Sequence, residues 1–194
     1  DAKERDYDWR SARHRVDLDS AEAIGKRAGE RAVRRVNPGA VKSGTLPVLF
    51  DPRIGGSLVG HLMGAIGGSM IARKTSFLLD ALGEALFDSA ISVIDDPLRP
   101  RGLGSRAFDG EGLPTARTAV IDKGVLTGWM MESAAARQLG LKPTGHASRG
   151  GSGAPGTSPS NLHLEGGVLS VAELISDIDY GVYIHELSGQ GVNI

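Results

Sequence analysis

The chain has 194 residues, which is enough for one sizeable domain or two small ones. Its 40% hydrophobic and 23% charged residues are typical of a soluble globular protein, and a formal net charge of −1 excludes a global field that attracts nucleic acid or anionic membranes. The absence of cysteine excludes disulfides, thiolate metal sites and a cysteine nucleophile. No apolar run approaches the roughly 20 residues that a membrane span needs, so we expect a cytoplasmic location.

The N-terminal 45 residues begin with a charged stretch and continue into a helix-start pattern. Asp19 and Glu22 have the spacing of a capping box, which predicts Asp19 as the N-cap of the helix. Apolar residues recur from Ala21 at helical spacing and predict an amphipathic helix that stops at the Asn-Pro-Gly sequence 37–39.

Four arginines gather in the second half of this predicted helix: Arg27, Arg31, Arg34 and Arg35. One interpretation is a stripe that binds nucleic acid. A solvated face is the favoured interpretation, because Glu22 and Glu30 are interspersed and no aromatic residue accompanies the arginines.

The stretch from Leu46 to Ala72 organises the rest of the chain. Val48–Phe50 predicts a short buried strand. Asp51 followed by Pro52 predicts a helix start, because Asp caps free backbone N–H groups and Pro fits the first helical position.

The predicted central helix has an apolar stripe made of Leu58, Leu62, Ala65 and Ile66. Its many glycines disfavour an isolated helix, since each costs roughly 1 kcal/mol relative to Ala. We therefore expect the helix to pack closely against other backbone, at Gly60 and Gly64 in particular.

Short helices and hairpins follow without regular β-α alternation. The patterns predict helices at 75–83, 132–139 and from Ser170, strands at 90–94, 117–121, 125–129, 161–164 and 181–187, and a long Gly/Ser/Pro-rich loop at 144–160. This arrangement predicts an α+β fold with mixed or antiparallel sheets and a central glycine-rich helix, rather than a doubly wound sheet.

His61 is the one chemically capable side chain inside the central helix. Its surroundings resemble the helical metalloprotease motif, in which two histidines bind zinc and a glutamate activates water. Here Leu62 stands in the glutamate position, and Ala65 and Ile66 one turn on cannot bind metal. Because a zinc site needs three or four convergent ligands, a packed helix histidine is the favoured interpretation of His61.

Paired acids form the second group of candidates. Asp95 and Asp96 could hold a hard cation, but a turn with an Asx cap is the favoured interpretation. Asp109 and Glu111 are flanked by glycines and could line a cleft together with His61.

Two other features carry less weight. Three further histidines, His146, His163 and His185, share no local spacing that would join them into a site. The Gly150–Gly156 segment lacks the Gly-Lys-Ser/Thr ending and the following helix of a phosphate loop.

Together these segments resemble the TldD/PmbA family, also called modulator of DNA gyrase, and specifically its PmbA (TldE) branch. The matching segments are Val48–Pro52, Gly60–Leu62, Ser76–Leu78 with Leu82-Gly83, Asp95–Pro97, Gly104-Ser105 with Phe108–Gly112, Gly124–Leu126, Thr144–Arg149, Asn161-Leu162 and Leu187–Gly189. The resemblance covers nearly all of the chain from about Leu18 onward, and its specificity rests on the order and spacing of the segments.

The resemblance implies an intracellular two-subunit protease. Its TldD-type subunit carries zinc through a His-Glu-x-x-x-His helix and a more C-terminal cysteine, and its PmbA-type subunit has a similar fold without those ligands. This chain departs from the TldD pattern at Leu62 and Ile66. The resemblance therefore implies no catalytic residue and no metal ligand here, with zinc only in a TldD-type partner.

The resemblance also sets the expected domain organisation. The chain opens on Asp1 without Met and closes at Ile194 directly after a predicted strand, so we expect a fragment. Residues 1–45 would end an N-terminal α/β region, and residues 46–194 would form the central and an incomplete part of the C-terminal β-rich domain.

Two functions remain open at this point. The first is a non-catalytic subunit that pairs with a TldD-type subunit and helps to bind unfolded peptides as added strands. The second is a homodimeric binding or structural protein, such as the gyrase modulator of the family name. Near-zero net charge favours neither a membrane nor direct contact with nucleic acid.

Overall fold

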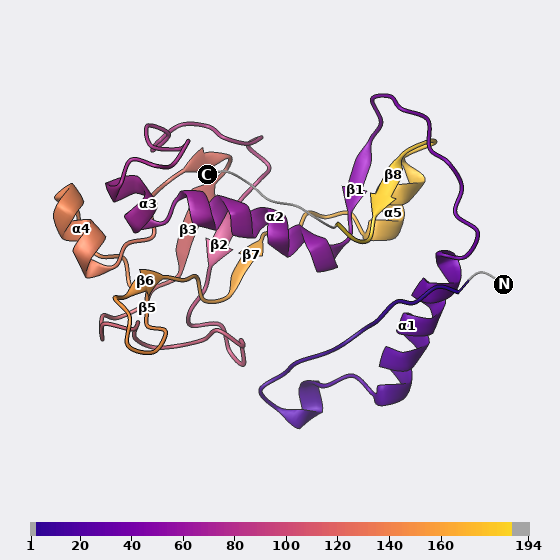
Figure 1. Cartoon of the computed structure of the whole chain (residues 1–194), viewed down its shortest axis with the longest axis horizontal. Coiled ribbons are helices and arrows are strands. Elements are labelled where there is room, and N and C mark those ends of the chain that lie inside the picture. Colours follow the sequence, from indigo (N-terminus) through magenta and orange to yellow (C-terminus); the bar gives the residue numbers. More distant parts are fainter. Residues whose placement is uncertain (1–2, 188–194) are drawn as a thin grey trace. The chain divides into compact units, whose positions relative to one another are not determined.

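A computed structural model describes residues 3–187, and these residues divide into two units. The first unit comprises residues 3–45 together with residues 101–103, and the second comprises residues 46–100 together with residues 104–187 (Figure 1). None of the helices described is long and apolar enough to cross a lipid bilayer.

The first unit contains the 3₁₀ helix η1 (Arg15–Asp17) and the helix α1 (Ala21–Arg34). The N-cap of α1 is Ser20, whose Oγ accepts a hydrogen bond from the backbone N–H of Ala23 at 3.1 Å. The prediction of Asp19 as the N-cap is therefore wrong. Asp19 instead forms an ion pair with Arg27.

Polar contacts are prominent in this unit, and none of its described residues is buried. The guanidinium of Arg13 donates to the backbone oxygens of Gly102 and Leu103, each at 2.8 Å. Arg101 forms an ion pair of 2.9 Å with Asp17. These contacts fasten residues 101–103 to the N-terminal segment.

The second unit contains the remaining elements. In chain order they are β1 (Val48–Phe50), α2 (Pro52–Ala65), α3 (Gly68–Ala72), β2 (Val93–Asp95), β3 (Thr118–Asp122), β4 (Val125–Leu126), α4 (Ser133–Leu139), β5 (Ala147–Ser148), β6 (Gly156–Thr157), β7 (Leu162–Leu164), α5 (Val171–Ser176) and β8 (Val182–Ile184). An antiparallel sheet has the order β4-β3-β2-β7, β5 pairs antiparallel with β6, and β1 pairs parallel with β8. The predicted α+β class with mixed and antiparallel sheets is confirmed.

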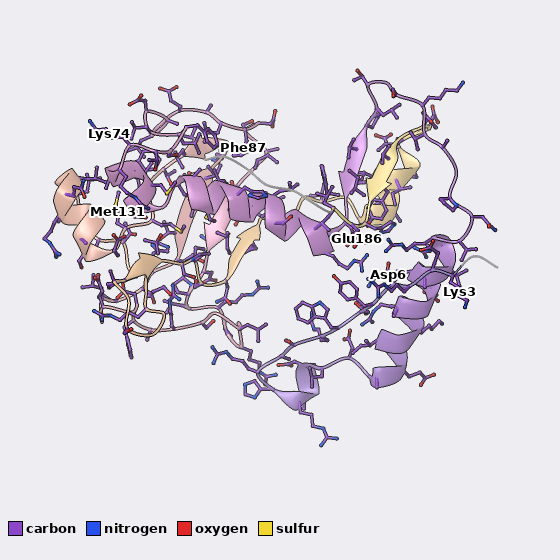
Figure 2. All side chains as sticks on the ribbon, viewed as in Figure 1. Lys3, Asp6, Lys74, Phe87, Met131 and Glu186 are labelled. Carbon is purple, nitrogen blue, oxygen red and sulfur yellow. The ribbon has the colours of Figure 1, made fainter. Side chains whose placement is uncertain are left out.

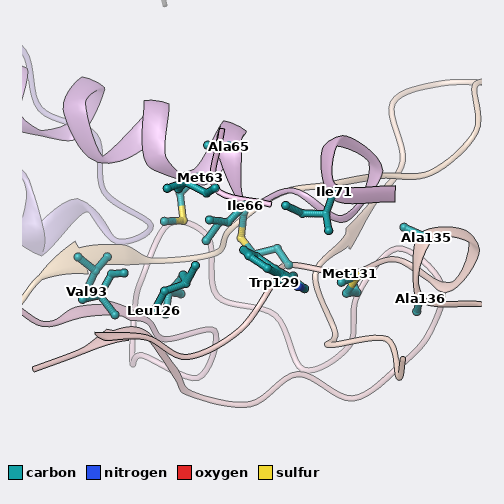
Figure 3. Packing of buried hydrophobic residues seen from close by; sticks show 14 residues of the cluster. Met63, Ala65, Ile66, Ile71, Val93, Leu126, Trp129, Met131, Ala135 and Ala136 are labelled. Atoms are coloured by element: carbon teal, nitrogen blue, oxygen red, sulfur yellow. The ribbon is translucent and has the colours of Figure 1, made fainter. Parts of the chain in front are cut away.

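The apolar core lies between α2, α3, α4 and the four-stranded sheet (Figure 3). Ile66, Ile121, Leu126 and Met131 are its largest fully buried apolar side chains. The complete cluster is Met63, Ala65, Ile66, Ile71, Leu78, Val93, Val120, Ile121, Leu126, Trp129, Met130, Met131, Ala135 and Ala136. Every buried apolar side chain of the described residues therefore lies between positions 63 and 147.

Helix α2 begins as its sequence predicts. Asp51 is its N-cap and accepts a hydrogen bond of 2.8 Å from the N–H of Arg53, with Pro52 at the first helical position. The predicted apolar stripe is wrong at Leu58, which is 40% exposed. The prediction is confirmed at Ala65 and Ile66, which are buried, and at Leu62, which packs against the core; Met63 and Val59 also face the core.

Close backbone packing occurs at the start of α3, not in the middle of α2. No atom outside the neighbouring helix backbone lies within 4 Å of a Cβ built on Gly60, so the predicted close packing is wrong there; at Gly64 it stays a prediction. A Cβ on Gly68 would lie 2.9 Å from Sδ of Met131 (Figure 2) and 3.0 Å from the Met130 carbonyl oxygen. The close approach therefore joins α3 to the segment before α4.

The hairpin and two of the helix ends follow local signals. β3 and β4 pair across Lys123 and Gly124, both of which have positive φ. Glu132 caps α4, and Gly140 ends it in the left-handed region at φ 68°. The predicted capping box of α5 is confirmed, because Ser170 and Glu173 exchange side chain-to-backbone hydrogen bonds.

The predicted helix at 75–83 is wrong. These residues form successive turns, and Ser76 Oγ accepts a hydrogen bond of 3.0 Å from the N–H of Leu78. A Ser side chain that bonds the nearby backbone in this way competes with helix formation. The N–H of Gly83 bonds instead to the Leu126 carbonyl oxygen, which places this segment beside β4.

The β1–β8 pair has no apolar core of its own. β1 forms as predicted, but Val48 and Phe50 are more than two-fifths exposed, so the prediction that it is buried is wrong. β8 is shorter than the predicted strand. Along 46–50 and 165–187 no residue is buried, and the residue that closes β1, Asp51, is a buried carboxylate.

Candidate functional site

His61 lies on α2, outside the buried apolar stripe of that helix. Its side chain is half-buried, and Nε2 is shielded from solvent without a hydrogen-bond partner. Positions 61 and 66 lie about 140° apart around a helix of 3.6 residues per turn. Ile66 is fully buried in the apolar core, so its side chain points away from the His61 imidazole.

These residues do not fit a zinc ion. A single imidazole is accompanied by Leu62, Ala65 and Ile66, none of which has a donor atom. Across residues 3–187, no three His, Cys, Asp or Glu side chains converge as a ligand set.

Asp109 is buried and holds two loops together. Its Oδ1 accepts hydrogen bonds from the N–H groups of Glu111 and Leu113, each at 2.9 Å, and its Oδ2 accepts one from Ala147 at 3.1 Å. Burial raises the pKa of Asp109, but these backbone hydrogen bonds and nearby Arg106 outweigh it, so the pKa lies below its ordinary value.

Glu111 lies in the same turn and supports the start of α4. Its Oε2 accepts hydrogen bonds from the N–H of Ser133 at 2.9 Å and from its hydroxyl at 2.6 Å. The structure thus brings Asp109 and Glu111 together, and it shows no bond from either carboxylate to His61. A cleft-lining role for the three residues stays a prediction.

A buried polar cluster at the end of β2 joins Asp95 to His146, which no spacing in the sequence connects. Nε2 of His146 lies 3.3 Å from Oδ2 of Asp95, and both side chains are at least nine-tenths buried. The other carboxylate oxygen accepts hydrogen bonds from the backbone N–H of Ser160 at 2.7 Å and from its hydroxyl at 2.9 Å. Nδ1 of His146 lies 2.8 Å from Oγ1 of Thr144.

The ionised form of Asp95 is stabilised by this cluster. Burial raises the pKa of Asp95, but the hydrogen bonds from His146 and Ser160 outweigh burial and hold the pKa below its ordinary value. Both ring nitrogens of His146 are engaged and the ring is buried, so the cluster fixes the position of the chain around it.

The cluster anchors both ends of the glycine-rich segment 144–161. Arg106 donates to the carbonyl oxygen of Ser158 at 2.8 Å, and the side chain of Asn161 bonds Gly104, Asp96 and Ser105. Between these anchors, β5 and β6 form a short hairpin, and β6 contacts α3. The long loop predicted from composition is therefore a hairpin with fixed ends.

A second polar cluster surrounds Asp51. Its Oδ2 lies 3.2 Å from Nδ1 of His185 and accepts a hydrogen bond of 3.3 Å from the hydroxyl of Tyr183. The two rings are in edge-to-face contact with centroids 4.5 Å apart. Burial raises the pKa of Asp51, but the bonds from Arg53, His185 and Tyr183 outweigh it and lower the pKa.

Sequence signals for these clusters were present but incomplete. Asp95 is the last residue of the apolar strand β2. The predicted Asx turn forms at Asp96, which accepts a hydrogen bond of 3.1 Å from the N–H of Leu98. The predicted cap role of Asp51 is confirmed. Their partners lie 65 and 132 residues away in the sequence, where no local spacing can connect them.

Comparison with known proteins places this fold. Residues 43–194 match the PmbA/TldA metallopeptidase C-terminal domain. The chain is 37% identical over 190 residues to the metalloprotease PmbA of Escherichia coli O157:H7, an alignment that covers 98% of this chain and 40% of the relative.

Solved structures agree with the sequence match. A candidate modulator of a DNA gyrase from Thermotoga maritima superposes with a TM-score of 0.85 and 36% identity, over 94% of this chain and 42% of that one. TldE of Thermococcus kodakarensis superposes with a TM-score of 0.79 and 27% identity, over 89% of this chain and 40% of that one. The chain thus spans about two-fifths of the length of these relatives, and it belongs to the PmbA/TldD metallopeptidase family.

Proposed function

We propose that this chain belongs to a non-catalytic, PmbA/TldE-type subunit of a TldD/TldE-type zinc metallopeptidase that acts on unfolded peptides. The observation that carries the proposal is the donor-poor surroundings of His61: Leu62 is apolar, and Ile66 is buried in the core. The structural similarity of the chain to TldE of Thermococcus kodakarensis supports the same branch of the family.

Zinc titration of the purified chain tests the non-catalytic assignment. We expect no stoichiometric tight binding, because one imidazole supplies one ligand. The variant His61→Ala serves as the control and should leave any weak binding by the other histidines unchanged. Tight binding of one zinc ion per chain that is lost in His61→Ala would overturn the assignment.

The edge strand β7 is the element most suited to a peptide. The four-stranded sheet has two edges, β4 and β7; β4 also forms a bridge from Val125 to Ala85, whereas β7 pairs with β2 alone among the described strands, and Leu164 is half exposed. A peptide added to such an edge is bound through main-chain hydrogen bonds, which do not read its sequence. This mode suits a subunit whose substrates are unfolded chains.

The partner subunit is tested by pull-down with a TldD-type protein. Association, with peptidase activity gained only in the mixture, is the expected result. The second candidate function is that of a homodimeric binding protein that modulates DNA gyrase; similarity to the candidate gyrase modulator of Thermotoga maritima supports the gyrase part of it. A stable homodimer that does not bind the TldD-type subunit would support this candidate instead.

The domain assignment and the location remain parts of the proposal. We assign residues 1–45 to the end of an N-terminal α/β region and residues 46–194 to the central and C-terminal metallopeptidase-type region. A cytoplasmic location accords with the intracellular protease that the family resemblance implies. Cell fractionation with an antibody against the full-length protein tests it.

A further inference from the structure

Three arginines form a row along one face of α1. Arg27, Arg31 and the C-cap residue Arg35 are spaced by four residues, which places their side chains above one another on a helix. Each of them forms an ion pair with an acidic residue from the segment that precedes the helix. We call these three residues the arginine row and residues 4–9 the acidic strap.

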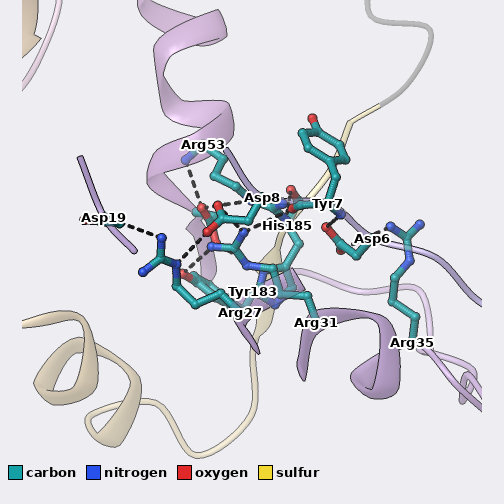
Figure 4. A network of polar contacts seen from close by, with 11 residues as sticks. Asp6, Tyr7, Asp8, Asp19, Arg27, Arg31, Arg35, Arg53, Tyr183 and His185 are labelled. Carbon is teal, nitrogen blue, oxygen red and sulfur yellow. Dashed lines mark hydrogen bonds and ion pairs between the residues drawn. The ribbon is translucent and has the colours of Figure 1, made fainter. Parts of the chain in front are cut away.

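The strap lies along the row through charged contacts (Figure 4). Asp8 bridges two arginines: its Oδ2 lies 2.5 Å from Nε of Arg27, and its Oδ1 lies 2.9 Å from Nη1 of Arg31. Asp6 lies 3.5 Å from Arg35. The Asp8 side chain is 11% exposed, so the row encloses a carboxylate even though the unit has no apolar core.

The row also bonds to the main chain of the strap. Nη1 of Arg31 donates to the backbone carbonyl oxygen of Tyr7 at 3.3 Å. The aromatic side chains of the strap do not anchor it, since Tyr7 is 63% and Trp9 64% exposed. The strap is therefore held through carboxylates at alternate positions, Asp6 and Asp8, and through the Tyr7 carbonyl between them.

We propose that the arginine row is a docking surface for an acidic, extended peptide segment of another protein chain, and that the strap is its occupant in cis. Guanidinium groups pair with carboxylates through paired, charge-assisted hydrogen bonds. The strap is linked to α1 by a short connection, so it competes at a high effective concentration. A partner segment must displace the strap before it can bind the arginine row.

A peptide fits the row better than a nucleic acid does. The carbonyl bonded by Arg31 is a group that a phosphate backbone lacks. Glu22 and Glu30 on the same helix, together with the net charge of −1, oppose a polyphosphate. Nucleic acid is therefore the alternative that the experiment must distinguish.

The test uses the variant Asp8→Asn, which removes the charge that bridges Arg27 and Arg31. The probe is a fluorescein-labelled peptide with the sequence of residues 3–9, titrated by anisotropy at about 0.05 M salt. We expect tighter binding to Asp8→Asn than to the unchanged chain, because the cis occupant is weakened. Binding should decline steeply at about 0.5 M salt, where the Debye length is a few ångströms.

Matched variants locate the binding. On the Asp8→Asn background, Arg31→Gln should lower the affinity for the peptide by about five- to tenfold, equivalent to roughly 1–1.4 kcal/mol of binding free energy. Arg34→Gln makes the same charge change on the same helix; Arg34 has no ion pair among the described residues, so no comparable loss is expected. A probe peptide with Asn in place of both aspartates should not bind.

Defined outcomes overturn the proposal. Equal binding to Asp8→Asn and to the unchanged chain, equal losses in Arg31→Gln and Arg34→Gln, or no binding at all would each do so. Tighter, Arg31-dependent binding of a single-stranded oligonucleotide of equal charge would assign the row to nucleic acid instead. Far-UV circular dichroism verifies that α1 is intact in Asp8→Asn. If this variant loses the helix, the test is made on the unchanged chain, where excess unlabelled peptide should compete with the labelled peptide. Absence of competition there overturns the proposal.

Discussion

Asp95 places a carboxylate at a position that is 1% exposed, where it is tolerated because His146 and Ser160 satisfy its oxygens. We expect Asp95→Asn to lower the free energy of unfolding by about 1.5–3 kcal/mol, since it weakens charge-assisted hydrogen bonds in the core. Urea unfolding measures the change. Asp96→Asn is the matched control, because Asn can still accept the hydrogen bond from Leu98.

The same carboxylate makes stability depend on pH. The folded-state pKa of Asp95 lies below its ordinary value of 3.8, so the unfolded chain binds more protons as the solution is acidified. This contribution is complete above the ordinary value and is lost as the pH falls through the folded-state pKa. In urea unfolding between about pH 3 and 7, the free energy of unfolding should fall less on acidification for Asp95→Asn than for the unchanged chain. Identical pH profiles for the two proteins would contradict this prediction.

His61 has a buried Nε2 atom with no hydrogen-bond partner, so its removal breaks no bond at that atom. We expect His61→Ala to leave the peptidase activity of a reconstituted two-subunit complex largely intact, with at most a modest loss of stability. The assay is run beside a metal-ligand variant of the TldD-type subunit, which should be inactive. Loss of activity with assembly and stability preserved would place the chemistry in this chain after all.

The glycines of α2 and α3 differ in what surrounds them, and matched substitutions separate the two cases. Gly60 is exposed with open space around it, so Gly60→Ala should raise stability by up to about 1 kcal/mol through helix propensity. Gly68→Ala should lower it by about 1–3 kcal/mol, because the added methyl meets Met131, Ala135 and a backbone oxygen. Thermal unfolding measures both, and a higher melting temperature for Gly68→Ala would contradict the close packing of α3.

The β1–β8 pair depends on polar contacts at Asp51 rather than on buried apolar surface. Asp51→Asn keeps an N-cap for α2 but removes the charge that His185 and Tyr183 contact. We expect faster hydrogen exchange confined to residues 165–187, with the four-stranded sheet unchanged. Asp177→Asn, in the same region, is the control. Faster exchange spread equally over the sheet would show that the pair is not a separate element of stability.

The two units should lose structure at different denaturant concentrations. The apolar cluster belongs to the second unit, whereas no described residue of the first unit is buried. We therefore expect α1 to lose protection against hydrogen exchange at urea concentrations well below the midpoint for β2 and β3. Mass spectrometry of exchanged peptides measures this, and simultaneous loss of protection in both units would contradict it.

Elements whose signals lie within a few residues could be predicted correctly from the chain alone. The α5 capping box, the Lys123-Gly124 turn and the Gly140 helix end each depend on neighbours in sequence. Two local predictions were wrong: Asp19 lost the cap position to the neighbouring Ser20, and the helix at 75–83 lost to a hydrogen bond between the Ser76 side chain and the Leu78 backbone. Spacing alone does not rank such local alternatives. The family also followed from the order of short segments, and the comparisons confirm it.

Burial and long-range pairing could not be predicted from neighbouring residues in the sequence. Val48 and Phe50 have the composition of a buried strand, yet their exposure depends on which elements pack on β1. Asp95 meets Ser160 and Asp51 meets Tyr183 because the fold brings together residues 65 and 132 positions apart. Local preferences act over one or two turns of chain, whereas these contacts form only when the sheet order and helix packing are complete.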